Sequence, residues 1–394
     1  MRISIVNGFF LPLPPVAGGA TEKSWYNLAH IFAERGHEVT VISRRWPGFP
    51  DEETRDGIRH IRLCGADHRR QLWRNLLLDF LWSWRVSLAL PTADIVVVNA
   101  VALPAWLGKW KPRAGRVVIM TGRMPKGQYR HYRGIARVLA ASSFVRDRVV
   151  AENPTLAPVT HVVGYPINWQ LMNPTSGTSP AGTAGDTGEI TIGYVGRIHE
   201  EKGLLLLADA LKVLSQYPGL PAWRLLLCGP SDVERGGSGP EFRQQLTEKI
   251  LTALPADRFT FIEPQFDESA LAGVYRRIAI FCYPSIAAQG ETFGVAVAEA
   301  MAAGAVPLVS RLACFTDFVR DEKNGLVFDH NAPDAASRLA TALARLLRDT
   351  ALRSTLAQNA PLDVRTYDYA AYADSLLTDF GGLISSNGQT SSRS

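Results

Sequence analysis

The sequence predicts an α/β protein with two parallel-sheet domains, and three observations support this. Short apolar, β-branched runs alternate with longer amphipathic segments along the chain, which is typical of βαβ units. The alternation is interrupted at 173–189 by a segment of mostly Gly, Ser, Thr, Pro and Ala, which is too polar to bury a core. The length of 394 residues suits two domains of ordinary size.

The first domain is expected over 1–172. Its strands are predicted at 2–6, 38–42, 94–98, 116–120 and 137–141, and its helices at 20–35, 69–90 and 142–152. The strands are almost continuously apolar, as expected where helices cover both faces of a parallel sheet.

The second domain is expected over 190–362, after a linker at 173–189. Strands are predicted from 190 and at 223–228, 258–262, 278–282, 305–309 and 325–328. Helices are predicted at 203–217, 241–253, 268–277, 296–303, 334–347 and 350–359. We expect a crossover helix back to the first domain at 363–380, and a polar tail without structure at 381–394.

Composition excludes several classes of protein. The net charge of +5 is mild, so it fits phosphorylated ligands or an anionic membrane surface better than nucleic acid. The four cysteines have no C-x-x-C spacing, which indicates a reducing compartment and no zinc site. Neither a secretory signal nor an apolar run of about 18 residues is present, so we expect a cytoplasmic protein.

Two glycines follow the first predicted strand and precede a helix. Gly18 and Gly19 allow a backbone to approach a ligand closely, and the start of a helix favours an anion. A flexible loop is the alternative interpretation. No G-x-G-x-x-G is present here, so the fingerprint of a dinucleotide-binding dehydrogenase is missing.

Two cations follow the first strand of the second domain, in GYVGRIHEEKG. Gly196 and Arg197 end the strand, and Lys202 comes five residues later. A guanidinium fork and an ammonium at this position suit a diphosphate. A solvated charged turn is the alternative, and the next motif argues against it.

Two glutamates are separated by seven residues in GETFGVAVAEAMAAG. Glu291 lies in a glycine-flanked loop, whereas Glu299 lies on a helix of small residues. A carboxylate accepts two hydroxyl hydrogens, which suits sugar diols. The alternative places Glu299 on a solvated surface, but its apolar neighbours favour a partner or a ligand. The amides of Thr292, Phe293 and Gly294 are predicted to form an anion cradle.

These motifs resemble those of the retaining glycosyltransferases called group 1, family 4 type, which have the GT-B architecture of two Rossmann-like domains facing across a cleft. The resemblance covers nearly the whole chain, including ARVLAASSFVRDRV at 136–149 and LLLCGP at 225–230. It implies a nucleotide-sugar donor (UDP- or GDP-sugar) and a glycan or lipid-linked glycan acceptor in surface polysaccharide synthesis. No metal or other cofactor is implied, and no D-x-D motif occurs.

The resemblance also assigns roles to residues. It implies that Arg197 and Lys202 bind the donor pyrophosphate and stabilise the leaving group. Glu291 is expected to contact the transferred sugar, and Glu299 the ribose. Gly19 is expected to let the first domain close over the phosphates.

The sequence departs from the family on the acceptor side. A histidine often follows the strand matching 116–120, but Thr121, Gly122 and Arg123 stand there. Arg123 and Lys126 are therefore only candidates for acceptor contact. Other functions remain open: a catalytically silent sugar-nucleotide or glycan-binding protein, or an epimerase of the same architecture.

The segment 68–86 is basic and rich in tryptophan. One interpretation is a helix at a membrane interface, giving peripheral membrane contact. The interpretation we favour from the sequence is a helix whose aromatic face packs on the sheet, because the βαβ pattern needs a helix here. Oligomeric state is not indicated.

Overall fold

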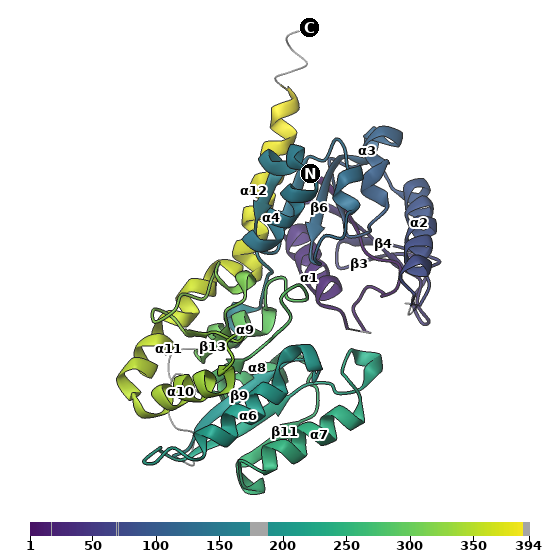
Figure 1. The fold of residues 1–394 in the computed structure, drawn as a ribbon. Coiled ribbons are helices and arrows are strands. Elements are labelled where there is room, and N and C mark those ends of the chain that lie inside the picture. The colour runs from purple at the N-terminus through teal and green to yellow at the C-terminus, as the bar shows by residue number, and fades with distance from the viewer. Residues whose placement is uncertain (17, 68, 70, 174–187, 389–394) are drawn as a thin grey trace. The chain divides into compact units, whose positions relative to one another are not determined.

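The computed structural model describes residues 1–16, 18–67, 69, 71–173 and 188–388. The chain forms two compact units. Unit 1 contains Met1–Pro166 and Tyr369–Ser394, and unit 2 contains Ile167–Asp368. Each unit has its own sheet (Figure 1), so the α/β class with two parallel-sheet domains is confirmed.

Unit 1 contains an eight-stranded sheet in the order β3-β4-β2-β1-β5-β6-β7-β8. Its strands are β1 (Arg2–Val6), β2 (Glu38–Arg44), β3 (Glu52–Arg55), β4 (Ile58–Leu63), β5 (Ile95–Val98), β6 (Arg116–Thr121), β7 (Arg137–Ala140) and β8 (Thr160–Val162). All neighbours are parallel except β3 and β4. Strands β3, β4 and β8 were not predicted from the sequence.

The helices of unit 1 are α1 (Ala20–Glu34), α2 (Leu72–Ala89), the short α3 (Leu107–Trp110), α4 (Ser143–Glu152) and α12 (Tyr369–Gly388). Trp82 and Val86 of α2 enter the same buried cluster as strand residues such as Val96 and Val98. On another side, Phe380 of α12 packs against Phe32 of α1, with ring centroids 6.3 Å apart.

Unit 2 contains a six-stranded, fully parallel sheet in the order β11-β10-β9-β12-β13-β14. Its strands are β9 (Ile190–Val195), β10 (Trp223–Cys228), β11 (Phe259–Ile262), β12 (Ile280–Tyr283), β13 (Val306–Ser310) and β14 (Leu326–Phe328). Its helices are α5 (Trp169–Met172), α6 (Leu204–Leu214), α7 (Pro240–Leu251), α8 (Glu268–Arg276), α9 (Val295–Ala302), α10 (Ala335–Arg348) and α11 (Thr350–Val364).

Several expected boundaries differ from the structure. The units divide after Pro166, and α5 belongs to unit 2, where the Trp169 indole donates to the Pro361 carbonyl at 2.9 Å. The chain returns to unit 1 at Tyr369 rather than at 363. The expected tail without structure is wrong for 381–388, which continue α12 because Leu383 packs into the core. Residues 174–187 of the expected linker and 389–394 lie outside the described residues.

The expectation that α2 packs its aromatic face on the sheet is also wrong. Trp82 is buried, but Trp73, Phe80 and Trp84 are 62%, 48% and 42% exposed. None of the helices in the described ranges is long and apolar enough to span a bilayer.

Candidate functional site

The strand order of unit 2 reverses between β9 and β12. Ligands bind beyond the carboxyl ends of strands at such a reversal in open α/β sheets. The loop 196–203 follows β9, and the loop 284–294 follows β12, so two of the sequence motifs meet at this point. Their backbones are joined where the Ile286 amide donates to the Glu201 carbonyl at 3.0 Å.

Arg197 lies at the surface of this loop pair. Its guanidinium donates to the Gly236 carbonyl at 2.9 Å and to Oε1 of Glu201 at 2.7 Å. The side chain is 44% exposed. Gly196, just before it, has a φ of 151°, and a Cβ there would lie 2.7 Å from the Tyr194 hydroxyl. A glycine is therefore needed where the chain leaves β9.

Lys202 and Glu291 form a buried ion pair. The distance from Nζ of Lys202 to Oε2 of Glu291 is 2.7 Å, and the two side chains are 6% and 11% exposed. The same Oε2 accepts from the Tyr283 hydroxyl at 3.1 Å and from the Ser285 hydroxyl at 3.3 Å. The Lys202 ammonium also lies 5.5 Å from the centroid of the Tyr283 ring. The carboxylate is thus held firmly enough to present its second oxygen in one direction.

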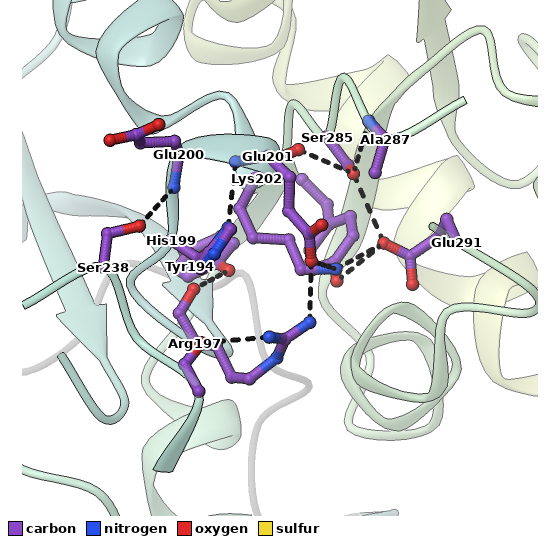
Figure 2. A network of polar contacts seen from close by, with 12 residues as sticks. Tyr194, Arg197, His199, Glu200, Glu201, Lys202, Ser238, Ser285, Ala287 and Glu291 are labelled. Carbon is purple, nitrogen blue, oxygen red and sulfur yellow. Dashed lines mark hydrogen bonds and ion pairs between the residues drawn. The ribbon is translucent and has the colours of Figure 1, made fainter. Parts of the chain in front are cut away.

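Glu201 links the two cations. Its Oε1 accepts from Arg197 and lies 3.8 Å from Nζ of Lys202 (Figure 2). Charges therefore alternate along Arg197, Glu201, Lys202 and Glu291. This network was not predicted as a unit, because Glu201 alone looks like an ordinary exposed acid in a turn.

Burial keeps the tyrosines around this network protonated. Desolvation is the main cause that raises the pKa of Tyr194 and Tyr283 well above the usual value, and the charge of Glu291 adds to it. Both hydroxyls can therefore donate at all physiological pH values. Tyr194 donates to the Arg197 carbonyl at 2.8 Å, which fixes the backbone of the cationic loop.

Glu299 lies on α9 and is half-buried. The Tyr275 hydroxyl donates to Oε2 of Glu299 at 2.8 Å, and burial, followed by this carboxylate, raises the Tyr275 pKa well above its usual value. The sequence argument that this acid needs a partner therefore identified a real contact, although the partner itself was not predictable.

Helix α9 begins directly after the loop with Thr292, Phe293 and Gly294. Gly294 caps the helix with a φ of 96°, and a Cβ there would lie 2.5 Å from Cε1 of Phe315. Phe293 is 1% exposed and packs against Phe318 and Tyr367, with ring centroids 4.8 and 5.0 Å away. Its side chain thus anchors the loop, and only its backbone is suited to ligand contact.

Unit 1 has a cavity of about 220 Å³ where its own strand order reverses, between β1 and β5. Segments following β1, β5 and β6 line it, together with the first turn of α1 and one side of α2. The lining is mixed: aromatic rings (Phe9, Phe10, Tyr129 and Tyr132) stand beside carboxyl and amide groups.

Two acids in this cavity are almost fully buried. Glu22 and Asp79 are each 5% exposed, and desolvation is the main cause that raises the pKa of both carboxyls. Asp79 accepts from the amides of Val101 and Ala102 at 3.2 and 2.7 Å. Neither acid was predicted from the sequence. For Asp79 a signal exists, because it is the only acid within the apolar stretch 68–93.

Asn99 offers a further polar group to the cavity. Its Nδ2 donates to the Val6 carbonyl at 3.1 Å, whereas its buried Oδ1 has no hydrogen-bond partner within the described residues. Of the two acceptor-side candidates, Arg123 lines the cavity, and its guanidinium lies 5.5 Å from the Phe10 ring. Lys126 is exposed and is not among the lining residues.

Gly18 and Gly19 precede α1 with φ values of 80° and 100°. A Cβ on Gly19 would lie 2.2 Å from Oε2 of Glu22, so the glycine leaves room for that carboxyl at the helix start. Nothing within 4 Å restricts a Cβ at Gly18.

The fold and these sites define a two-domain protein of the GT-B class, and comparisons support this. The family model "Glycosyltransferase Family 4" matches residues 17–164, and "Glycosyl transferases group 1" matches residues 178–363. The chain belongs to this family of group 1, family 4-type glycosyltransferases.

Curated relatives match over part of their length. D-inositol 3-phosphate glycosyltransferase of Corynebacterium urealyticum is 33% identical over 195 residues, which is 49% of this chain and 43% of the relative. Phosphatidyl-myo-inositol mannosyltransferase of Mycobacterium tuberculosis is 31% identical over 192 residues, 48% of this chain and 46% of the relative. The matches thus span less than half of these relatives.

Among solved structures, the chain resembles sucrose-phosphate synthase from Thermosynechococcus elongatus with a TM-score of 0.75 and 24% identity. The match covers 98% of this chain and 100% of the other, so the fold is shared over its full extent.

Proposed function

We propose that this protein transfers a sugar from a UDP- or GDP-sugar to a glycan or lipid-linked glycan acceptor, with retention of configuration and without a metal ion. The alternating network of Arg197, Glu201, Lys202 and Glu291 at the strand reversal of unit 2 carries the proposal. It places two cations and a fixed carboxylate where a ligand of an open α/β sheet is expected.

The two cations have different tasks. Arg197 is partly exposed, and its guanidinium is held by the Gly236 carbonyl and by Glu201, so its fork can turn toward the donor diphosphate. Lys202 is buried and fixed by Glu291, so it supplies a stationary positive charge. Both stabilise the negative charge that grows on the nucleoside diphosphate as it leaves.

The acids recognise hydroxyl groups. The second oxygen of Glu291 accepts from the transferred sugar, and Glu299 accepts from the ribose. The amides of Thr292, Phe293 and Gly294 complete this side of the site at the start of α9. Gly18 and Gly19 provide backbone close to the donor phosphates, and Arg123 contacts the acceptor, with Lys126 outside the cavity.

The transfer proceeds on one face of the sugar. The acceptor oxygen bonds to C1 as the bond from C1 to the phosphate oxygen breaks, and that phosphate oxygen takes the proton of the acceptor hydroxyl. Such a step needs no dedicated protein base. The relatives named for inositol phosphate and phosphatidylinositol suggest a phosphorylated or lipid-linked cyclitol as a further acceptor class to test.

The test is thermal-shift binding of UDP, GDP, ADP and their common sugars, with and without EDTA. We expect one nucleotide series to stabilise the protein equally in both conditions, and Arg197→Ala to abolish the shift. Stabilisation that requires a divalent ion, or a shift that survives Arg197→Ala, would contradict the donor site. Retention is checked by NMR of the first sugar released from the donor, which should keep its configuration at C1.

A further inference from the structure

Helix α2 turns most of its large apolar side chains away from the protein. Its buried residues are Asp79, Trp82, Ser83, Val86 and Ser87, and three of these five are polar. The opposite side carries an exposed apolar stripe with helical spacing, formed by Trp73, Leu77, Phe80, Leu81, Trp84 and Leu88. Leu77 is 52% and Leu88 70% exposed. An apolar stripe along a whole helix is more than the scattered exposure of ordinary surfaces.

The stripe continues onto α3. Trp110 is 64% exposed, and its ring centroid lies 5.0 Å from that of Trp84. Lys111 ties the two helices together, because its Nζ donates to the carbonyls of Ser87 and Leu90 at 3.0 and 2.6 Å. The α2–α3 surface, defined as the stripe plus Trp110, is therefore one connected patch. Helix α2 lies on the side of unit 1 away from α12 (Figure 1).

The charge around this surface is positive. Residues 68–136 contain twelve arginines and lysines but two acids, Asp79 and Asp94. Asp79 lies on the buried side of α2, and Asp94 is paired with Arg2 at 2.7 Å. Within 69–113, the charged residues that the structure describes as exposed are all basic: Arg69, Arg74, Arg85, Lys109 and Arg113. This segment alone carries more positive charge than the net +5 of the whole chain, so the rest of the chain is acidic overall.

The surface reaches the rim of the unit 1 cavity. Leu72 and Leu76 line the cavity and are also 60% and 48% exposed. They lie beside the stripe on the same helix, about two turns and about one turn before Asp79. A ligand whose polar part sits among Glu22, Asp79 and Asn99 thus has an apolar path from the cavity to the α2–α3 surface.

We propose that the α2–α3 surface docks on an anionic lipid bilayer and that the acceptor is anchored in that bilayer, with its polar headgroup in the cavity. Indole rings beside arginines suit the region of lipid headgroups, and the basic residues complement anionic lipids. A second copy of this chain fits less well, because a two-fold interface would bring two positive faces together. The membrane contact stands by itself, whereas the anchored acceptor rests on the proposed function.

The experiment is flotation of the full chain with vesicles of phosphatidylcholine alone and with about 30% phosphatidylglycerol. Wild type should float with the anionic vesicles, and the floated fraction should fall at high salt because the attraction is partly electrostatic. Leu77→Glu/Leu88→Glu should bind at least about tenfold more weakly. Leu251→Glu/Leu362→Glu is the matched control, since it adds the same charge at exposed leucines of unit 2 and should bind like wild type.

Two results overturn the membrane contact: wild type that stays with the soluble fraction, or equal weakening in both double variants. Size-exclusion chromatography of the same proteins tests the alternative that a second copy of the chain covers the surface. If wild type is a dimer and Leu77→Glu/Leu88→Glu is a monomer, the surface is a protein interface.

Nucleotide thermal shifts on all three proteins separate this test from the donor site. If wild type does not float with the vesicles but nucleotides still raise its melting temperature, the membrane contact fails and the proposed function stands. Flotation without any nucleotide shift leaves the membrane contact standing and removes the proposed function and the anchored acceptor with it.

Discussion

Units 1 and 2 each hold a polar cluster where the order of strands reverses, after β1 and β5 in one and after β9 and β12 in the other. In unit 2 the charged groups satisfy one another, since Lys202 is paired with Glu291 and Arg197 with Glu201. In unit 1 the acids are buried beside a cavity, and Oδ1 of Asn99 has no partner within the described residues.

The difference indicates two kinds of ligand. A self-paired network of both signs suits a charged ligand, because a phosphate that replaced Glu201 at Arg197 would leave Glu201 beside Lys202, so no ion would be unpaired. The cavity of unit 1 holds two buried carboxyls, Glu22 and Asp79, whose pKa is raised mainly by desolvation. Such groups, with tyrosines nearby, suit the hydroxyls of an uncharged headgroup or sugar.

The largest effect is expected from breaking the buried pair of unit 2. Lys202→Ala leaves Glu291 charged and buried, so we expect a loss of about 3–5 kcal/mol in the free energy of unfolding. Urea denaturation measures it. Lys249→Ala is the control, because its pair with Asp209 is 37% and 46% exposed and should contribute less than about 1 kcal/mol.

The double change Lys202→Met/Glu291→Gln sharpens this prediction. It removes both charges, so most of the stability should return, whereas donor binding should be lost because Lys202 no longer supplies its positive charge. Full donor binding by this double variant would show that the pair is only structural.

A smaller loss is expected from the backbone of the donor loop. Gly294→Ala forces a side chain onto a φ of 96° and against Phe315, and should destabilise unit 2 by about 1–3 kcal/mol. Nucleotide affinity should fall with it, because α9 then starts at a different position. Gly273→Ala, in α8 with open space around the new Cβ, should be neutral or slightly stabilising. Equal unfolding free energies for the two variants would argue against a strained loop.

The smallest effect concerns unit 1 and depends on pH. Because the folded-state pKa of Glu22 is raised, the folded protein holds the proton more tightly than the unfolded chain does. Its contribution to stability is therefore lost as pH rises above the usual glutamate value of 4.5 and through the raised value. Glu22→Gln should match wild type near pH 4 and be slightly more stable at pH 7. Thermal melting at both pH values measures this, and a variant that is less stable at pH 7 would contradict the burial of a charged carboxyl.

The sequence predicts more of the candidate site in unit 2 than in unit 1. Arg197 and Lys202 lie close together in one short segment, and Glu291 and Glu299 in another, so local sequence reveals them. The contacts they form depend on the tertiary fold, which no local pattern encodes: Lys202 meets Glu291 because β9 and β12 lie side by side, and Glu299 of α9 meets Tyr275 of α8. In unit 1, Glu22 and Asp79 lie on different helices and come to line one cavity only through the tertiary fold.

Helix α2 shows a second limit. Its sequence is apolar at most positions around the helix, so periodicity predicts a helix but not which side faces the sheet. The buried side is set by Trp82, whose indole donates to the Asn7 carbonyl at 3.0 Å, and by Asp79, which binds two backbone amides. These polar anchors turn the stripe outward, which is why the packing predicted from the sequence was wrong.

The central claim is that the charged network of unit 2, and not the cavity of unit 1, binds the nucleotide. Hydrogen exchange measured by mass spectrometry with and without saturating nucleotide diphosphate tests it most directly. Slower exchange in peptides covering 196–203 and 290–299, absent in Arg197→Ala, is the predicted result. Protection confined to 98–101 and 119–132, around the cavity, would contradict it.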